Sequence, residues 1–313
     1  MVTTFGLVLG AGGVVGSAYH AATLTALAEV GIDARDASLI VGTSAGSGTG
    51  AVVRAGFPPA DLTNRLLGMP VSAEAAAIVE RTGGPPTIPM RPRPFSRPPV
   101  PSSLGMAMRN WRHPGKVITG LLPRGTVPTG VISESIDLLY DDLPWPEDPL
   151  WVCAVRLDNG ELRVFGRDDV DVSIGTAVRA SSAIPGFFEP VVHRGTSYVD
   201  GGLRSPTNAD LLAELALAVV IIVSPMSATS GGQRAGGLSS RPIHSRRLSS
   251  EVATLRAHGV EVVTVQPTAD DVAVMGRNAM DASRREPVAN QALATARARF
   301  DDPRIAEILD ELR

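Results

Sequence analysis

Two apolar stretches near the start of the chain each end in a glycine-rich turn, and a helical pattern follows each turn. The first stretch covers residues 5–9, and apolar residues then recur at helical spacing over residues 17–30. The second covers residues 39–41 and is followed by small residues from 42 to 55. Strand, turn and helix repeated over so short a distance are typical of an α/β fold. The sequence therefore predicts a mainly parallel central sheet flanked by helices.

Similar patterns continue along the chain. Further strands are expected over residues 151–157, 162–165, 197–199, 218–223 and 260–265, and helices over 131–140, 245–257 and 290–300. The most apolar run, residues 215–223, has about half the roughly 20 residues of a membrane-spanning helix and is expected to be a buried strand. We interpret residues 1–313 as a single domain with two excursions, a Pro/Arg-rich segment at 83–103 and a Gly/Ser-rich loop at 227–240.

Charge and cysteine content narrow the class of protein. The formal net charge of -3 argues against a dedicated nucleic-acid-binding protein, because phosphate binding requires a cationic surplus. The single cysteine, Cys153, cannot form an intrachain disulfide, which favours a reducing compartment. The first residues show no basic cluster ahead of an apolar segment, so we expect no signal peptide and a cytoplasmic location.

The sequence Gly42-Thr43-Ser44-Ala45-Gly46 matches the pattern G-x-S-x-G. It follows an apolar strand and precedes a helix of small residues, which is the setting of a nucleophile elbow. Glycines are needed there because the serine occupies a tight, strained turn. An ordinary Gly-rich strand-to-helix turn remains the alternative interpretation.

A second glycine-rich segment, residues 10–16, lies between the first strand and the first helix. Consecutive glycines let backbone N–H groups converge on one concavity, which can hold the oxyanion that forms during acyl transfer. The alternative is a dinucleotide-binding turn. Its G-x-G-x-x-G pattern fails here, because the third glycine would fall on Val15.

A third signal is Asp200, which ends a short apolar run and precedes Gly201 and Gly202. A carboxylate at this point can lie at the same sheet edge as the predicted elbow. The alternative interpretation is a turn in which the aspartate bonds its own backbone. The nearby stretch 180–190 is too apolar to be a simple linker.

Histidine placement argues against a conventional Ser–His–Asp triad, which needs an imidazole within reach of the serine. None of the five histidines occupies an obvious strand-to-loop junction late in the chain, and we expect surface or helix-packing roles for His20, His113, His193, His244 and His258. No metal-ligand spacing and no P-loop is found, so no metal or other cofactor is expected.

Together these segments resemble the patatin-like phospholipase family. The glycine loop at 10–16, the G-x-S-x-G motif around Ser44, the stretch 180–190 and the sequence Asp200-Gly201-Gly202 follow one another in that family's order. The resemblance covers about residues 5–225. It implies a three-layer α/β/α fold with a mainly parallel sheet, and hydrolysis of carboxylic esters of lipids.

The resemblance also implies a Ser–Asp dyad that works without histidine. Ser44 would attack the ester, Asp200 would accept its proton, and water activated by Asp200 would hydrolyse the acyl-enzyme. The oxyanion would be held by the backbone N–H groups of Gly12, Gly13, Val14 and Ala45. Because an ordinary carboxylate is a weak base, with a pKa of about 3.9, we expect desolvation to raise the pKa of Asp200 toward neutrality.

The chain departs from the family in its glycine loop, where Val15 replaces the usual Arg or Lys and Ala11 a frequent glycine. Loss of that cation predicts lower activity or a less charged substrate. The segment 83–103 has two open interpretations, a flap that can also touch an anionic membrane and a solvated excursion. Two rival functions are a catalytically silent protein that binds a lipid or protein partner, and a nucleotide-dependent oxidoreductase.

Overall fold

The structure of the chain, a computed structural model, describes residues 4–82, 101–141, 143–168, 171–235 and 240–313. The strands in these residues are β1 (Phe5–Leu9), β2 (Leu39–Thr43), β3 (Leu150–Arg156), β4 (Leu162–Phe165), β5 (Val191–His193), β6 (Thr196–Asp200), β7 (Val219–Val223) and β8 (Glu261–Val265). The α-helices are α1 (Gly13–Glu29), α2 (Ala45–Arg54), α3 (Leu62–Leu67), α4 (Ala73–Thr82), α5 (Leu104–Arg109), α6 (Pro114–Leu121), α7 (Gly130–Leu139), α8 (Ile174–Ser182), α9 (Ser230–Ala235), α10 (Arg241–Ala257), α11 (Ala269–Met275), α12 (Arg285–Phe300) and α13 (Pro303–Asp310).

All of these strands belong to one sheet with the order β5-β6-β3-β2-β1-β7-β8, and β4 pairs with β3 outside this path. The five strands from β3 to β8 along this order run parallel to one another. Among the described residues, the antiparallel pairs are β3 with β4, β3 with β6 and β5 with β6. The predicted α/β fold with a mainly parallel sheet is confirmed.

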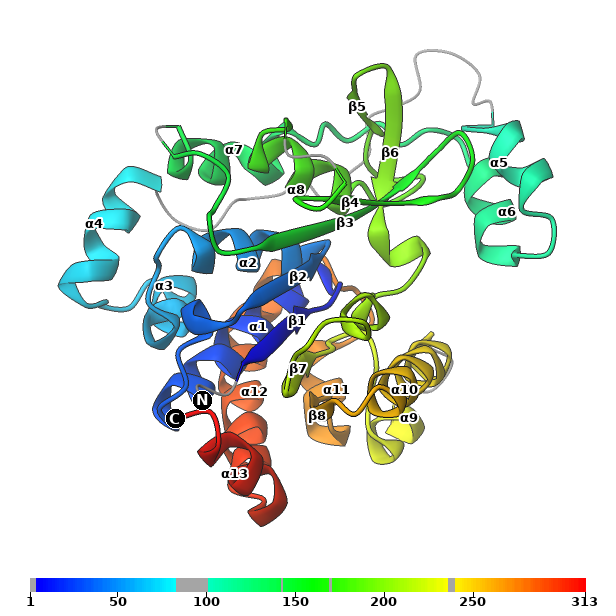
Figure 1. Cartoon of the computed structure of the whole chain (residues 1–313). Coiled ribbons are helices and arrows are strands. Elements are labelled where there is room, and N and C mark those ends of the chain that lie inside the picture. The colour runs from blue at the N-terminus through cyan, green and yellow to red at the C-terminus, as the bar shows by residue number, and fades with distance from the viewer. Residues whose placement is uncertain (1–3, 83–100, 142, 169–170, 236–239) are drawn as a thin grey trace.

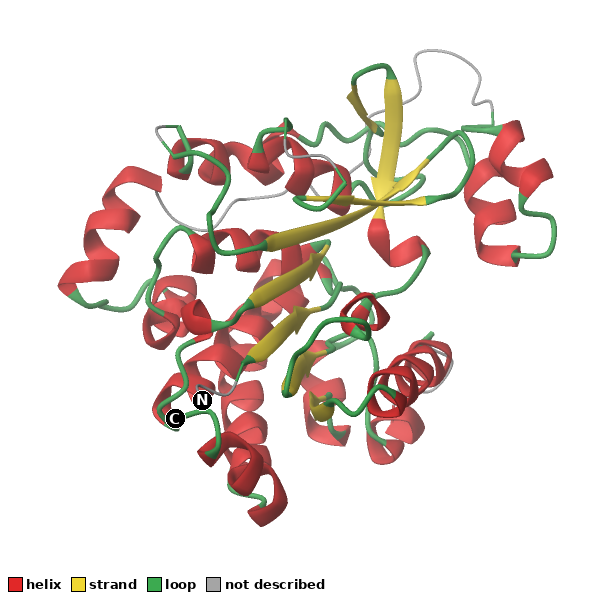
Figure 2. Ribbon diagram, viewed as in Figure 1, coloured by secondary structure: helices red, strands yellow, loops and turns green. Residues whose placement is uncertain are grey.

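Helices cover both faces of the sheet, which gives three layers (Figures 1 and 2). Because alternate strand residues point to opposite faces, Leu7 and Leu9 of β1 belong to one apolar cluster and Val8 to another. The first cluster includes residues of α1, α2, α8 and α12, whereas the second includes Leu248 and Leu255 of α10. Strands buried on both faces explain the continuous apolar runs in the sequence.

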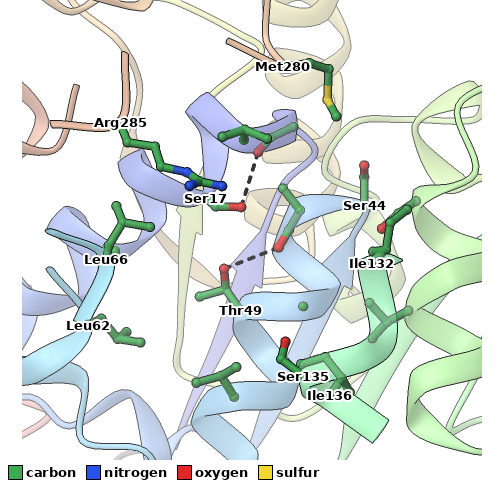
Figure 3. A pocket seen from close by; sticks show the side chains of 18 of the residues that line it. Ser17, Ser44, Thr49, Leu62, Leu66, Ile132, Ser135, Ile136, Met280 and Arg285 are labelled. Carbon is green, nitrogen blue, oxygen red and sulfur yellow. Dashed lines mark hydrogen bonds between the residues drawn. The ribbon is translucent and has the colours of Figure 1, made fainter. Parts of the chain in front are cut away.

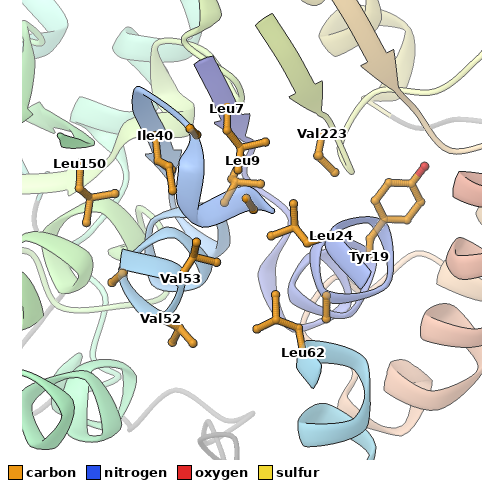
Figure 4. Packing of buried hydrophobic residues seen from close by; sticks show 14 of the residues in the cluster. Leu7, Leu9, Tyr19, Leu24, Ile40, Val52, Val53, Leu62, Leu150 and Val223 are labelled. Carbon is orange, nitrogen blue, oxygen red and sulfur yellow. The ribbon is translucent and has the colours of Figure 1, made fainter. Parts of the chain in front are cut away.

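Helix α1 lies in the middle of the larger cluster, and its residues from Val14 to Leu27 are almost all buried (Figure 4). It packs against the sheet on one side and against α12 on the other. A helix that is apolar around its whole circumference requires such a site. Full burial of side chains such as Leu24 contributes about 2 kcal/mol each, so the helix and the loop that precedes it are held firmly.

The structure also corrects part of the sequence interpretation. Residues 227–240 were expected to form a loop, but Ser230–Ala235 forms the short helix α9. The carbonyl of Thr229 accepts from the N–H of Gln233, and Gly232 fits closely against the backbone of Pro267 and Thr268. A glycine-rich sequence is helical here because tertiary contact outweighs its low propensity. Residues 83–100 of the Pro/Arg-rich segment lie outside the described residues.

Of the apolar run at 215–223, Val219–Val223 forms the buried strand β7, whereas residues 215–218 precede the strand. Among the described residues, no helix is both long enough and apolar enough to cross a bilayer.

Candidate active site

Ser44 stands between β2 and α2, at the apex of a sharp turn. Its backbone has φ 54°, a left-handed value that few residues other than glycine adopt. A Cβ atom at Gly46 would overlap the carbonyl oxygen of Leu9, and one at Gly42 would lie 2.5 Å from the Cα of Ser47. Both glycines are therefore required because α2 begins directly against the ends of β1 and β2. This is the geometry of a nucleophile elbow.

Buried hydrogen bonds hold the strained backbone of Ser44 on both sides. Its N–H donates to the hydroxyl of Ser181 at 2.8 Å, and that hydroxyl donates to the carbonyl of Cys153 at 2.6 Å. Its carbonyl accepts from the N–H and the hydroxyl of Ser47, at 2.9 and 2.6 Å. A hydroxyl has only one proton to donate, so the roles of Ser181 are fixed. The sequence did not single out Ser181, although a polar pair within the apolar stretch 180–190 was a usable signal.

The register of the sheet brings Asp200 to the level of Ser44. Thr43 of β2 pairs with Cys153 of β3, and Ala154, the next residue of β3, pairs with Asp200 of β6. Although β6 runs antiparallel to β3, it ends at the level where β2 ends. Ser44 and Asp200 are both buried at this level, and the hydroxyl of Ser44 lies close enough to the carboxyl group of Asp200 to act on its pKa.

Burial sets the charge state of Asp200. Removal of the carboxyl group from water raises its pKa to about 6, although hydrogen bonds from the Gly202 N–H and the Ser44 hydroxyl act in the opposite direction. The Gly202 N–H lies 2.7 Å from Oδ1 of Asp200. The turn in which the aspartate bonds its own backbone is thus present, together with the contact to Ser44. The raised pKa agrees with the sequence expectation.

The glycine loop and the start of α2 supply backbone donors near Ser44. Within the described residues, no acceptor bonds the N–H groups of the four predicted oxyanion residues, Gly12, Gly13, Val14 and Ala45. The first turn of a helix leaves such groups free. Gly13, Val14 and Ala45 line the same cavity as Ser44, whereas Gly12 is not part of that lining and abuts Pro225.

The cavity beside Ser44 has a volume of about 160 Å³. Figure 3 shows side chains from α2, α3, α7 and the C-terminal part of the chain around it. Its wall is mainly apolar and includes Leu62, Ile136, Phe188 and Met280. Such a cavity suits a hydrocarbon chain placed next to the serine. The sequence did not predict that Met280 lines the cavity, because this depends on the tertiary contact between residues 279–280 and the glycine loop.

Ala279 and Met280, from the C-terminal part of the chain, pack against the glycine loop and hold it in place. The N–H of Val15 donates to the carbonyl of Ala279 at 3.0 Å. Gly13 has φ +60°, and a Cβ atom there would lie 2.8 Å from the same carbonyl oxygen and 2.9 Å from the sulfur of Met280. A side chain at position 13 is therefore excluded by conformation and by space.

The position of Val15 changes the interpretation of the missing cation. Its side chain is buried, 2% exposed, within the larger apolar cluster rather than directed at the cavity. Two arginines line the cavity instead, Arg65 and Arg285, and no Asp or Glu belongs to the described lining. Burial lowers the pKa of Arg65, whose guanidinium group lies 5.4 Å from the centre of the Phe57 ring. The expectation of lower activity or a less charged substrate stays a prediction.

No hydrogen bond between Ser44 and any of the five histidines exists among the described residues. His20 is fully buried between α1 and α2, and burial lowers its pKa to about 3, so its imidazole is neutral. In the same part of the chain, no group of three or more His, Cys, Asp or Glu side chains could hold a metal ion.

Comparisons with known proteins show which proteins this chain is similar to. The sequence profile described as "Patatin-like phospholipase" matches residues 7–213. The crystal structure of VipD from Legionella pneumophila is similar in structure, with a TM-score of 0.46 and 13% sequence identity, over 98% of this chain and 66% of that chain. The chain thus spans a little under two thirds of the VipD chain. The comparison with curated proteins gives no match.

Proposed function

Because the chain belongs to the patatin-like phospholipase family, we propose that it hydrolyses carboxylic esters of lipids with Ser44 as nucleophile and Asp200 as base. Membership of this family supports a lipid acyl hydrolase function in general terms. The finer proposal rests mainly on one observation, the position of the Ser44 hydroxyl beside a buried carboxyl group whose pKa is about 6. At neutral pH that carboxyl group is largely ionised and can accept a proton.

The reaction proceeds in two halves. In the first, Asp200 takes the proton from Ser44 as its oxygen attacks the ester carbonyl carbon, and the backbone donors of the glycine loop and Ala45 stabilise the oxyanion. The alcohol then leaves with the proton held by Asp200, and the acyl group stays on Ser44. In the second, Asp200 deprotonates a water molecule that attacks the acyl-enzyme, and the carboxylic acid is released as Ser44 regains its proton.

The cavity wall favours esters that carry an anionic group close to the acyl chain. Arg65 and Arg285 both line it, and its described lining contains no Asp or Glu side chain. Figure 3 shows Arg285 directed toward the cavity near Ser17. A half-desolvated guanidinium group binds a carboxylate or phosphate more strongly than one in water does.

Labelling with a fluorophosphonate probe tests the nucleophile. We expect wild type to be labelled, Ser44→Ala to be unlabelled, and Asp200→Asn to react at least about 100-fold more slowly, because the base is lost. Ser182→Ala is the matched control, because Ser182 lines the same cavity as Ser44. This variant should be labelled at Ser44 at the wild-type rate. Labelling of Ser44→Ala at the wild-type rate would move the nucleophile elsewhere. No labelling of wild type would favour the catalytically silent binding protein.

A further inference from the structure

Large exposed apolar side chains are concentrated in one part of the molecule. Of eleven in the described residues, six belong to the segment 104–122, which contains helices α5 and α6. They are Leu104, Met108, Trp111, Ile118, Leu121 and Leu122. Met108 is 71% exposed and Trp111 69%. A soluble protein rarely groups such side chains on its surface without a partner.

The spacing of these residues places them on the outer faces of the two helices. Positions 104, 108 and 111 follow the helical repeat in and just after α5, and 118, 121 and 122 follow it in and just after α6. The inner faces are occupied, because Met106 is fully buried against Val155 and Val199 of the sheet. The exposed apolar side chains therefore do not take part in packing the hairpin against the sheet.

The two helices form a closed hairpin, which we call the α5–α6 hairpin (residues 101–123). The N–H groups of Ser102 and Ser103 donate to the carbonyls of Leu122 and Gly120, at 2.8 and 3.0 Å. A Cβ atom at Gly120 would lie 2.9 Å from the N of Ala107, so the helices are in close contact. Figure 1 shows the hairpin at the periphery of the molecule, away from the layers of the core.

The charge of this region is positive. Residues 101–133 contain Arg109, Arg112, Lys116 and Arg124 and no Asp or Glu, in a chain of net charge -3. The turn at 158–161 adjoins the hairpin, since the side chain of Asn110 donates to the carbonyl of Asn159. In this turn Asp158 forms an ion pair with Arg156 and Glu161 accepts from Asn159, although Glu161 also acts on Lys116. Arg109 and Arg112 are exposed, and the guanidinium group of Arg112 lies 4.7 Å from the centre of the Trp111 ring.

We propose that the α5–α6 hairpin docks the protein onto the surface of an anionic lipid bilayer. Exposed Trp, Met and Leu side chains enter the interface between headgroups and acyl chains, while the neighbouring arginines bind anionic headgroups. Tryptophan favours this interface because its ring is both apolar and polar. The positive charge of the hairpin favours an anionic bilayer as the partner. A second copy of the chain is less suitable, because the two positively charged hairpins would repel each other in a symmetric dimer.

The base of the hairpin leads directly to the cavity beside Ser44. Leu122 contacts the position of Gly186, and the N–H groups of Thr126 and Val127 donate to the carbonyl of Phe187, at 3.2 and 3.1 Å. The next residue, Phe188, lines the cavity. Docking would therefore bring lipid near the cavity wall, and this consequence alone rests on the proposed function.

Vesicle sedimentation with the full chain tests docking. Vesicles of phosphatidylcholine alone are compared with vesicles that contain about one third phosphatidylglycerol. We expect binding to the anionic vesicles, weakened by salt, and a shift of Trp111 fluorescence to shorter wavelength. Arg109→Gln with Arg112→Gln should lower the partition coefficient by about fivefold per charge removed. Met108→Ser with Trp111→Ser should lower it at least about tenfold.

Helix α10 offers matched controls, because Ile243 is 67% exposed and Arg246 and Arg256 are exposed as well. Ile243→Ser, and Arg246→Gln with Arg256→Gln, should leave vesicle binding unchanged. Equal binding by the hairpin and control variants would overturn the proposal. So would a dimer that only the hairpin variants convert to monomer, since it would identify a second copy as the occupant.

Turnover of a water-soluble short-chain ester by the same variants separates docking from catalysis. The hairpin variants should keep the wild-type rate on this substrate, because none of the changed residues lines the cavity. Absence of ester hydrolysis by wild type would refute the proposed function and leave the vesicle result to decide on docking.

Discussion

The elbow at Ser44 and the α5–α6 hairpin use similar residues in opposite ways. At the elbow, apolar side chains such as Leu9 are fully buried, and the backbone of β1 leaves no room for even a methyl group on Gly46. In the hairpin, residues such as Trp111 lie in solvent although their helices are firmly attached. The proposed chemistry thus lies in a tightly packed part of the fold, and the proposed bilayer contact lies at its edge.

The largest expected effect concerns the rigid region. Gly46→Ala forces a Cβ atom into the carbonyl of Leu9, so β1 and α2 must separate. We expect a loss of at least about 3 kcal/mol in the free energy of unfolding, measured by urea denaturation. Gly48→Ala on the same helix is the control, because its Cβ would lie 3.9 Å from the nearest atom, in Val178. It should be neutral or stabilise by about 0.5 kcal/mol. Equal stabilities of the two variants would show that the elbow is not rigid.

The sequence predicted this region well for physical reasons. Strands buried on both faces produce continuous apolar runs, and turns without room for side chains require glycine, so β1, β2 and the elbow are recorded in local sequence. The sheet level shared by Ser44 and Asp200 depends on register across three strands. The local pattern placed Asp200 at a strand end that can lie at the same sheet edge, and the order of motifs supported this through the family resemblance.

The cavity and the hairpin were much less predictable. Met280 and Arg285 reach the cavity from the other end of the chain, and no local pattern signals a contact of that kind. Helix α5 has only six residues and outward apolar side chains, so its pattern does not show which face is buried. Short elements that depend on tertiary contacts are the hardest to infer from propensity.

The titration of Asp200 should make the activity depend on pH. The expected change in kcat/KM is of intermediate size among these predictions. The base must be ionised, so kcat/KM should rise about tenfold per pH unit up to pH 6 and then level off, with the midpoint at the pKa of about 6. A pH–rate profile on a soluble ester measures this. A flat profile between about pH 5 and 8 would contradict the role of Asp200 as base.

Stability should move in the opposite direction over the same pH range. In the unfolded chain the pKa of Asp200 is near the ordinary value of 3.8, whereas in the folded protein its pKa is about 6. The folded state therefore binds more protons than the unfolded state between these two pH values. The contribution of protonated Asp200 to the free energy of unfolding is complete below pH 4 and is lost as the pH rises through 6. The loss is at most about 3 kcal/mol. Asp200→Asn should remove this dependence, and an unchanged dependence would show that Asp200 is not its source.

The smallest expected effect comes from the hairpin, in which Met106 and Met108 lie on opposite faces of α5. Met106 is fully buried against the sheet, whereas Met108 is 71% exposed. Met106→Ala should cost about 2 kcal/mol or more, since it leaves a cavity. Met108→Ala should change the free energy of unfolding in solution by less than about 0.5 kcal/mol, because its side chain makes little contact with the fold. Urea denaturation without lipid measures both. A large loss for Met108→Ala would mean that its apolar surface already serves the fold, which would remove the reason to assign that surface to a bilayer.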